Sequence, residues 1–168
     1  MIETKRLRIF PFNFLQLHKY IENDGSLELE LNLNRSIKVI SPELKDALLC
    51  DILPKVADVS KNYLFATLWT IVLKDENKMV GDLCFMGEPD ENGQIEVGYG
   101  TYKEYQNKGI MTEALSGMLE WAKTQTNVKS IVAHTNNDNP ASFAVLLKNN
   151  FSKIEENENL LKWIFQLP

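Results

Sequence analysis

The stretch from Gln94 to Thr135 constrains the fold more than any other part of the chain. Residues 94–100 and 130–135 have the composition of two short, largely apolar strands. Between them, apolar residues recur at helical spacing over about three to four turns: Met111, Leu115, Met118, Leu119 and Ala122. A strand, a helix and a second strand in this order predict a parallel pair of strands with a right-handed crossover.

The region before this unit predicts an antiparallel meander. Residues 63–73 are rich in aromatic and β-branched residues, and residues 79–86 are apolar apart from Gly81 and Asp82. Short polar turns separate these two strands from each other and from the strand at 94–100. The chain therefore belongs to the α+β class, with a mixed, mostly antiparallel sheet.

The two ends of the chain supply the remaining elements. A strand at Leu7–Phe10 should stop at Pro11, and a helix is expected over 15–21. Residues 27–33 stay undecided, because leucines alternate at strand spacing although Leu and Glu are good helix formers. Ser41-Pro42 and Asn139-Pro140 are typical helix starts, and Pro54 should disturb the end of the first of these helices. Two strands close the chain, the last over 160–167.

Length and charge restrict the class of protein. No linker or repeat divides the 168 residues, so we expect one domain over 1–168. The net charge of −5 argues against a nucleic-acid binder and weakly favours cationic partners such as amines. The start of the chain has no signal-peptide pattern and no run approaches about 18 apolar residues, which favours a cytoplasmic protein that does not bind membranes. Cys50 and Cys84 are expected to be buried free thiols.

The loop over 101–110 carries the chemistry. A loop that enters a helix directs unpaired backbone N–H groups outward, and the helix dipole adds partial positive charge, so phosphate can bind there. Gly109 allows a tight turn and a close approach to an anion, and Lys108 could add charge. The chain has no P-loop, and Lys103 replaces the third glycine of a dinucleotide-binding pattern, so a Rossmann domain is disfavoured.

Gln106-x-x-Gly109-x-Met111 resembles the pyrophosphate loop of the GNAT acetyltransferase superfamily. The runs 95–100 and 109–114 are similar to the Rim-type branch, which includes ribosomal-protein N-acetyltransferases. The segments 4–9, 139–142 and 146–151 resemble that branch in the same order along the chain. The resemblance implies a six- to seven-stranded sheet that is splayed at its centre and has flanking helices.

Three residues depart from the family pattern. Met111 replaces a small residue, and it could either crowd the pyrophosphate or point into the core. Asn150 replaces a glycine, and asparagine tolerates the left-handed conformation. No tyrosine lies within 139–151, where the superfamily often has the acid that protonates the thiolate.

The resemblance implies transfer of an acetyl group from acetyl-CoA to a primary amine by direct attack. The amine would be a protein N-terminus or a small molecule, and a non-catalytic CoA-binding module is the alternative. The pantetheine arm would pair with the strand at Tyr99–Thr101, and the loop would take the pyrophosphate. The residues implied in cofactor binding are Tyr99, Gly100, Thr101, Gln106, Asn107, Lys108, Gly109, Ile110, Met111, Thr112, Asn139 and Ser142.

Glu96 is the candidate base, because strand alternation places it on one face with Gly98 and Gly100. A solvated strand glutamate is the alternative. Ser142 is the candidate donor to the thiolate, and Asn139 could cap a helix, contact the cofactor or do both. No metal is expected, because His18 and His134 lack ligand spacing with each other or with a cysteine; His134 could still approach the cleft. Tyr102 and Tyr105 are expected to pack, and the oligomeric state is open between monomer and homodimer.

Overall fold

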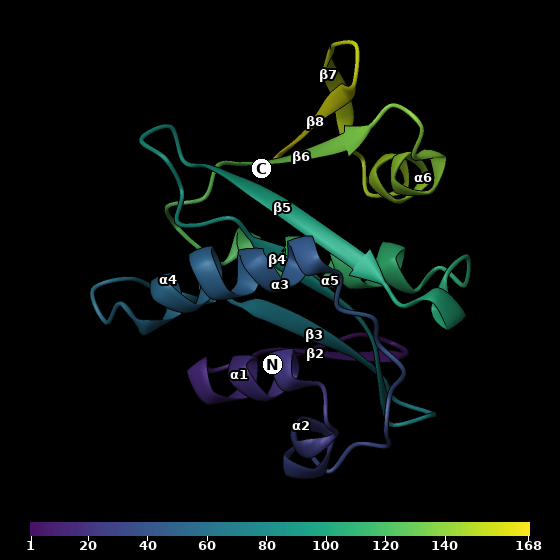
Figure 1. The fold of residues 1–168 in the computed structure, drawn as a ribbon. Coiled ribbons are helices and arrows are strands. Elements are labelled where there is room, and N and C mark those ends of the chain that lie inside the picture. The colour runs from purple at the N-terminus through teal and green to yellow at the C-terminus, as the bar shows by residue number, and fades with distance from the viewer.

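The computed structural model describes residues 1–168 and has one mixed sheet of eight strands in the order β1-β2-β3-β4-β5-β6-β8-β7 (Figure 1). All neighbouring pairs are antiparallel except β5 and β6. The strand beyond the seven expected is the two-residue β1. The strands are β1 (Ile2–Glu3), β2 (Leu7–Pro11), β3 (Leu68–Leu73), β4 (Lys78–Phe85), β5 (Gln94–Thr101), β6 (Ser130–Asn136), β7 (Ser152–Glu156) and β8 (Leu160–Gln166).

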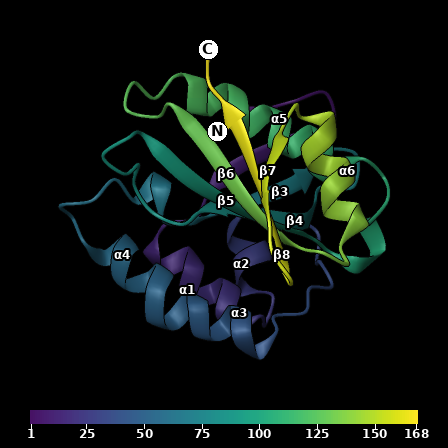
Figure 2. The same ribbon diagram turned by 90° about the horizontal axis from the view of Figure 1, so that it is seen from above.

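Helices cover both faces of the sheet (Figure 2), with α1, α3 and α4 on one side and α5 on the other. α6 lies beside the end of β6. The helices are α1 (Phe14–Glu22), α2 (Ser26–Glu30), α3 (Pro42–Ala47), α4 (Leu53–Ala57), α5 (Ile110–Lys123) and α6 (Pro140–Lys148), with a π-helical turn η1 (Leu48–Ile52) and 3-10 turns η2 (Tyr63–Phe65) and η3 (Lys103–Tyr105). None of these helices is both long and apolar enough to span a bilayer.

Strand alternation divides the buried side chains into two cores. The larger core lies under α5, where Ile71, Leu83 and Val97 pack against the apolar face of that helix. The five α5 residues expected at helical spacing are all buried. The smaller core lies under α1 and includes Tyr20, Val72 and Cys84. The central strands β3, β4 and β5 are thus fixed from both sides, which gives the site a rigid base.

The meander and the crossover are confirmed. β3, β4 and β5 pair in sequence order as antiparallel neighbours, and β5 runs parallel to β6 after the crossover through α5. The two helix starts are also confirmed, since Ser41 and Asn139 accept hydrogen bonds from the backbone N–H groups of Leu44 and Ser142. These elements have strong local signals in the sequence.

Several local expectations need correction. Residues 63–65 form a 3-10 turn and β3 begins only at Leu68, because the Asn62 side chain accepts a hydrogen bond from the N–H of Leu64 and starts a turn. Pro54 disturbs the helix that begins at Pro42, as expected, but does not end it. The helix widens into the π-helical turn just before the proline and continues to Ala57. A wide turn accommodates the proline ring and its missing N–H.

The two cysteines differ in their exposure to solvent. Cys84 is buried in the α1-side core as expected, whereas Cys50 is exposed. Cys50 lies in the π-helical turn η1, on the side of the helix that faces away from the sheet. Its burial was therefore wrongly expected.

Candidate functional site

The sheet opens between β5 and β6. The two strands pair at three positions only, Gln94 with Ser130, Ile95 with Ile131 and Glu96 with Val132. Beyond Glu96, β5 stays paired with β4 as far as Thr101, and β6 stays paired with β8 as far as Asn136. The edge of β5 that faces β6 therefore has no strand partner from Val97 to Thr101, and an extended ligand can pair with it.

The loop that follows β5 presents a row of backbone donors. Gly109 caps α5 with φ of 69°, and Asn107 also has a positive φ, of 61°. The first backbone bond of α5 runs from the N–H of Glu113 to the carbonyl oxygen of Gly109. The N–H groups of residues 107–112 consequently donate to no other protein atom. Six free donors at a helix N-terminus form an anion site.

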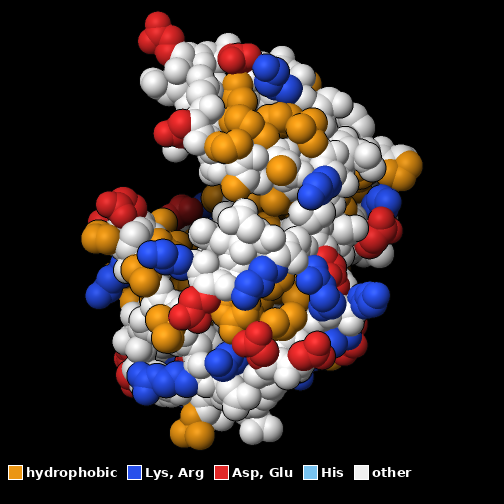
Figure 3. Space-filling view, turned by 90° about the vertical axis from the view of Figure 1, so that its right-hand side faces the viewer, with side chains coloured by type: hydrophobic (Ala, Val, Ile, Leu, Met, Phe, Trp, Pro, Cys, Tyr) orange, Lys and Arg blue, Asp and Glu red, His pale blue; other side chains and the backbone are white.

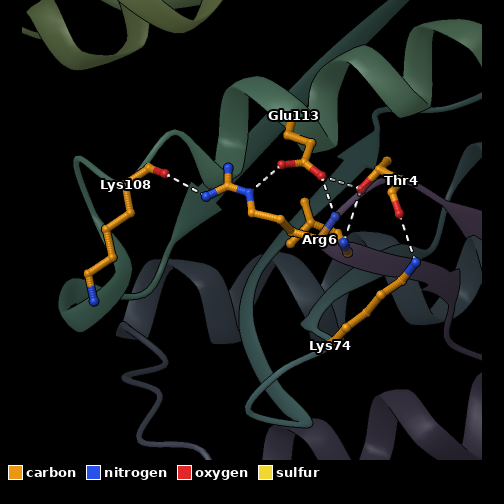
Figure 4. Close-up of polar contacts among 6 residues, drawn as sticks. Thr4, Arg6, Lys74, Lys108 and Glu113 are labelled. Atoms are coloured by element: carbon orange, nitrogen blue, oxygen red, sulfur yellow. Dashed lines mark hydrogen bonds and ion pairs between the residues drawn. The ribbon is translucent and has the colours of Figure 1, made fainter.

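Long-range contacts fix this loop in position (Figure 4). Glu113, in the first turn of α5, accepts hydrogen bonds from Thr4 Oγ1 at 2.6 Å, Arg6 N at 2.8 Å and Arg6 Nε at 2.6 Å. Arg6 then donates through Nη1 to the carbonyl oxygen of Lys108 at 3.1 Å. Although partial burial acts to raise the pKa of Glu113, the bonds from Thr4 and Arg6 outweigh it and lower the pKa. The charged group is therefore the form that the site stabilises.

A cavity of about 550 Å³ lies between this loop, the open edge of β5 and the start of α6. Figure 3 looks at the side on which α6 and the loop after β5 lie in Figure 1, and it shows a hollow at its left edge between the upper part of the molecule and the larger part below. Eleven of the twelve residues predicted to bind the cofactor line the cavity, among them Tyr99, Gln106, Gly109 and Asn139.

Lys108 is the predicted residue that does not line the cavity. Its Nζ lies 4.9 Å from the centre of the Tyr105 ring, so its charge is held at the aromatic face. Lys148, near the end of α6, lines the cavity instead and was not predicted. Met111 is 5% exposed and belongs to the α5-side core, so its side chain points inward and does not crowd the loop.

The start of α6 brings further polar groups to the cavity. Asn139 caps the helix by accepting a hydrogen bond from Ser142 N at 3.1 Å, so its side-chain oxygen is occupied. Tyr99 donates from its hydroxyl to the carbonyl oxygen of Ser142 at 3.4 Å. Burial raises the pKa of Tyr99 to about 12, so the phenol is a hydrogen-bond donor at neutral pH. Tyr99 thus places a phenol beside α6, although α6 itself has no tyrosine.

Glu96 lies at the point where β5 leaves β6. His134 Nδ1 is 2.9 Å from Glu96 Oε1, and both side chains are more than a third exposed. His134 comes from β6, so the contact joins the two strands just where their pairing ends. A carboxylate and an imidazole in contact can accept a proton and pass it on.

Two aromatic residues near the loop have partners that the sequence does not reveal. Tyr105 is buried and donates to Glu76, and Tyr102 donates to Asp82. Both pack, as expected. Asp82 is 9% exposed and is a charged residue within an apolar strand, a signal that could have marked it as unusual. Arg6, Glu113 and Lys148 lie within the segments that resemble the family, but nothing in the sequence shows which contacts they make.

The fold and the site define an α+β protein in which a helix N-terminus with free backbone N–H groups lies beside an open strand edge. A family model described as an acetyltransferase (GNAT) domain matches residues 19–152. The chain belongs to this family.

Comparison with individual proteins adds detail. Over 97 residues the chain is 37% identical to "Uncharacterized N-acetyltransferase YjdG" of Bacillus subtilis (strain 168), a match that covers 58% of each protein. The chain thus spans less than two thirds of that relative's length.

Solved structures share the fold at lower identity. The ribosomal-protein-S5-alanine acetyltransferase of Vibrio fischeri superposes with a TM-score of 0.70 at 19% identity, covering 98% of this chain and 94% of that one. The spermidine N-acetyltransferase of Vibrio cholerae, solved in complex with CoA and spermine, gives a TM-score of 0.67 at 12% identity, covering 97% and 96%. The same architecture therefore occurs in proteins named for a protein acceptor and for a polyamine.

Proposed function

We propose that this protein transfers an acetyl group from acetyl-CoA to a primary amine. The observation that carries the proposal is the row of free N–H groups at residues 107–112, which lies next to the open edge of β5. The first feature suits a diphosphate, and the second suits the amide-containing pantetheine arm. Membership of the GNAT family and the CoA-bound neighbour from Vibrio cholerae support this assignment.

Each part of the cofactor has a matching part of the cavity. The diphosphate accepts hydrogen bonds from the loop, with Gln106 bound through Nε2 to the carbonyl oxygen of Thr101 at 3.3 Å and thereby tied to β5. The arm pairs with the backbone of Tyr99, Gly100 and Thr101. Lys148 adds positive charge from the opposite wall, and Asn139 and Ser142 contact the arm near the thioester.

The chemistry requires a neutral amine and a stabilised leaving thiolate. Glu96 takes a proton from the amine, directly or through water, and His134 holds the carboxylate in place. The amine nitrogen then bonds to the thioester carbon, the carbon–sulfur bond breaks, and the nitrogen loses its second proton while the CoA thiolate takes one up. A backbone N–H at the splay stabilises the oxyanion. Ser142 supplies a hydroxyl donor for the thiolate in place of a tyrosine on α6, and Tyr99 supplies a second when its hydroxyl leaves the carbonyl oxygen of Ser142.

A thiol-release assay tests the activity. Acetyl-CoA is offered with peptides, polyamines, amino acids and other primary amines, and free CoA is measured. We expect release with at least one amine. CoA binding measured by calorimetry without release against any amine would identify the non-catalytic CoA-binding module instead.

A pair of glycine variants tests the cofactor position. Gly109 and Gly25 both cap helices with positive φ, and a methyl group at either would meet only ordinary contacts. Each alanine therefore costs about 1–2 kcal/mol of backbone strain, but only Gly109→Ala should weaken CoA binding, by about ten-fold or more. Equal CoA affinities in the two variants would place the diphosphate elsewhere.

A further inference from the structure

A second cavity, of about 580 Å³, lies on the α1 side of the sheet and meets the cofactor cavity at Tyr99, Gly100 and Thr101. Its volume lies within the range of sites for small organic molecules. Most of its lining is apolar and comes from the segment before α3, from α3 itself and from the central strands: Ile37, Val39, Leu44, Leu68, Leu83 and Met86. A molecule bound there lies next to the strand that would hold the acyl arm.

One buried carboxyl group lies in this apolar cavity, and the other charged lining residues, Lys103 and Glu104, are exposed. Asp82 Oδ2 accepts hydrogen bonds from the hydroxyls of Tyr20 at 2.7 Å and Tyr102 at 2.9 Å, and all three residues line the cavity. Asp82 Oδ1 has no hydrogen-bond partner at ordinary distance, although the buried hydroxyl of Thr70, its pairing partner on β3, acts to lower the pKa of Asp82. In the sheet Asp82 pairs with Gly100, where an added Cβ would meet no atom within 4 Å. There is space beside the carboxyl group on the face that a ligand would enter.

Asp82 forms no ion pair in the protein, although the charge of Lys38 acts to lower its pKa. The nearest buried cation, Lys38, forms its ion pair with Glu28 at 2.8 Å, and both side chains are under 5% exposed. Lys38 Nζ also lies 5.4 Å from the centre of the Tyr20 ring, so it is close to the cluster but already neutralised. Burial raises the pKa of Asp82 to about 6, which leaves it mostly ionised at neutral pH. A buried carboxylate without a counter-ion is costly, and a cationic ligand would stabilise it.

We propose that Asp82, together with the hydroxyl oxygens of Tyr20 and Tyr102, binds the ammonium group of the acceptor, and that the acceptor is a small primary amine with one positive charge and an apolar body. This assignment rests on the proposed function, since it names the acceptor of the same reaction. Glu96 does not line this cavity, so the proton of the bound ammonium group reaches Glu96 through water.

Calorimetry with phenethylamine tests the assignment in wild type and in Asp82→Asn, each with and without CoA. Asparagine can accept both tyrosine hydroxyls, so the variant removes the charge and keeps the hydrogen bonds. We expect Asp82→Asn to weaken phenethylamine binding by about ten-fold or more while CoA affinity is unchanged. Glu104→Gln, which removes an exposed acid from the same cavity, should leave phenethylamine affinity within about two-fold.

A measurement on wild type alone covers the case in which the variant does not fold. 2-Phenylethanol has the same apolar body without the charge and should bind at least about ten-fold more weakly than phenethylamine. Equal affinity for the two compounds, an unchanged affinity in folded Asp82→Asn, or tighter binding of spermidine or of a peptide with a free N-terminus would each overturn the assignment. A wild type that binds phenethylamine through Asp82 but does not bind CoA would refute the proposed function and leave the cation site standing.

Discussion

At the scale of single residues, Asp82 combines a structural cost with a binding function. Loss of water on burial raises its pKa from 3.8 to about 6, although hydrogen bonds from Tyr20 and Tyr102 act in the opposite direction. The folded protein therefore holds a proton on Asp82 more tightly than the unfolded chain does. The contribution of Asp82 to the free energy of unfolding is therefore at its maximum below about pH 4. It is lost as the pH rises through about 6.

This linkage predicts a pH-dependent difference between wild type and Asp82→Asn. Relative to the asparagine variant, wild type should lose on the order of 3 kcal/mol of unfolding free energy between pH 4 and pH 7. Urea unfolding of both proteins at several pH values measures this difference, and groups common to both cancel. A constant difference over that range would mean that Asp82 titrates normally.

Glu96 gives a prediction about turnover. Replacement by glutamine keeps the size and a hydrogen bond to His134 but removes the proton acceptor, so kcat should fall by about 10²-fold or more. CoA affinity serves as the internal control, because Glu96 does not line the cofactor cavity. An unchanged kcat from pH 6 to pH 9 would remove Glu96 from the role of base and favour the solvated strand glutamate.

The site residues that could be predicted from the sequence depend on local backbone conformation. Those that could not be predicted make contacts with residues far away in the sequence. Gly109 and Asn150 could be recognised from the sequence as positions with a left-handed backbone, because glycine and asparagine are among the few residue types that tolerate it. Both do adopt positive φ, 69° and 60°. The hydrogen bond between Tyr20 and Asp82 spans 62 positions, and that between Arg6 and Glu113 spans 107. No local pattern encodes such partners, so the loop was predictable whereas its anchors and the second cavity were not.

At the scale of elements, the first turn of α5 depends on a side chain from the start of β2. Glu113→Gln leaves one oxygen to accept from Thr4 and Arg6, and its amide cannot accept from Arg6 Nε. Arg6 then holds the Lys108 carbonyl less firmly, so the donors of the loop lose alignment. We expect CoA to bind about three- to ten-fold more weakly, with a stability loss of about 1–2 kcal/mol.

Glu120→Gln is the matched control for this prediction. Glu120 lies on the same helix and pairs only with Lys123, where its side chain is 69% exposed. Its replacement should change neither stability nor CoA affinity appreciably. Calorimetry measures the CoA affinity of both variants, and denaturant unfolding measures their stability. Equal changes in Glu113→Gln and Glu120→Gln would show that the loop does not depend on Arg6.

The segment 27–33 shows why some elements resist prediction. It forms the short helix α2 over Ser26–Glu30, so helix propensity prevails over the alternation of leucines. Leu27 is fully buried and Leu29 is 83% exposed, which a half-buried strand would not produce. Glu28 is buried because Lys38 pairs with it. The partner that allows Glu28 to be buried lies outside the segment.

At the scale of the whole molecule, the sheet consists of two parts joined by few hydrogen bonds. β1–β5 form one part and β6–β8 the other, with only three residue pairs between them. The parallel pairing of β5 and β6 was predictable from the crossover, whereas the insertion of β8 between β6 and β7 was not, because strand order depends on long-range packing. The α5-side core continues across the opening, since it includes both Val97 and Trp163.

Bound CoA should hold these two parts together, because the cofactor cavity lies between them. β5 and the loop before α5 line one side of the cavity, and α6 lines the other. Opening of the unit formed by α6 and β6–β8 would expose its amides to hydrogen exchange without unfolding β2 and β3. At a CoA concentration about 100 times the Kd, exchange in α6 should slow by about 100-fold. Amides in the centre of β3, which open only with the whole fold, are the reference. The contrary result is that the amides of α6 and β3 exchange at the same rate without CoA and slow equally with it. In that case the two parts unfold as one unit, and CoA suppresses no separate opening of α6 and β6–β8.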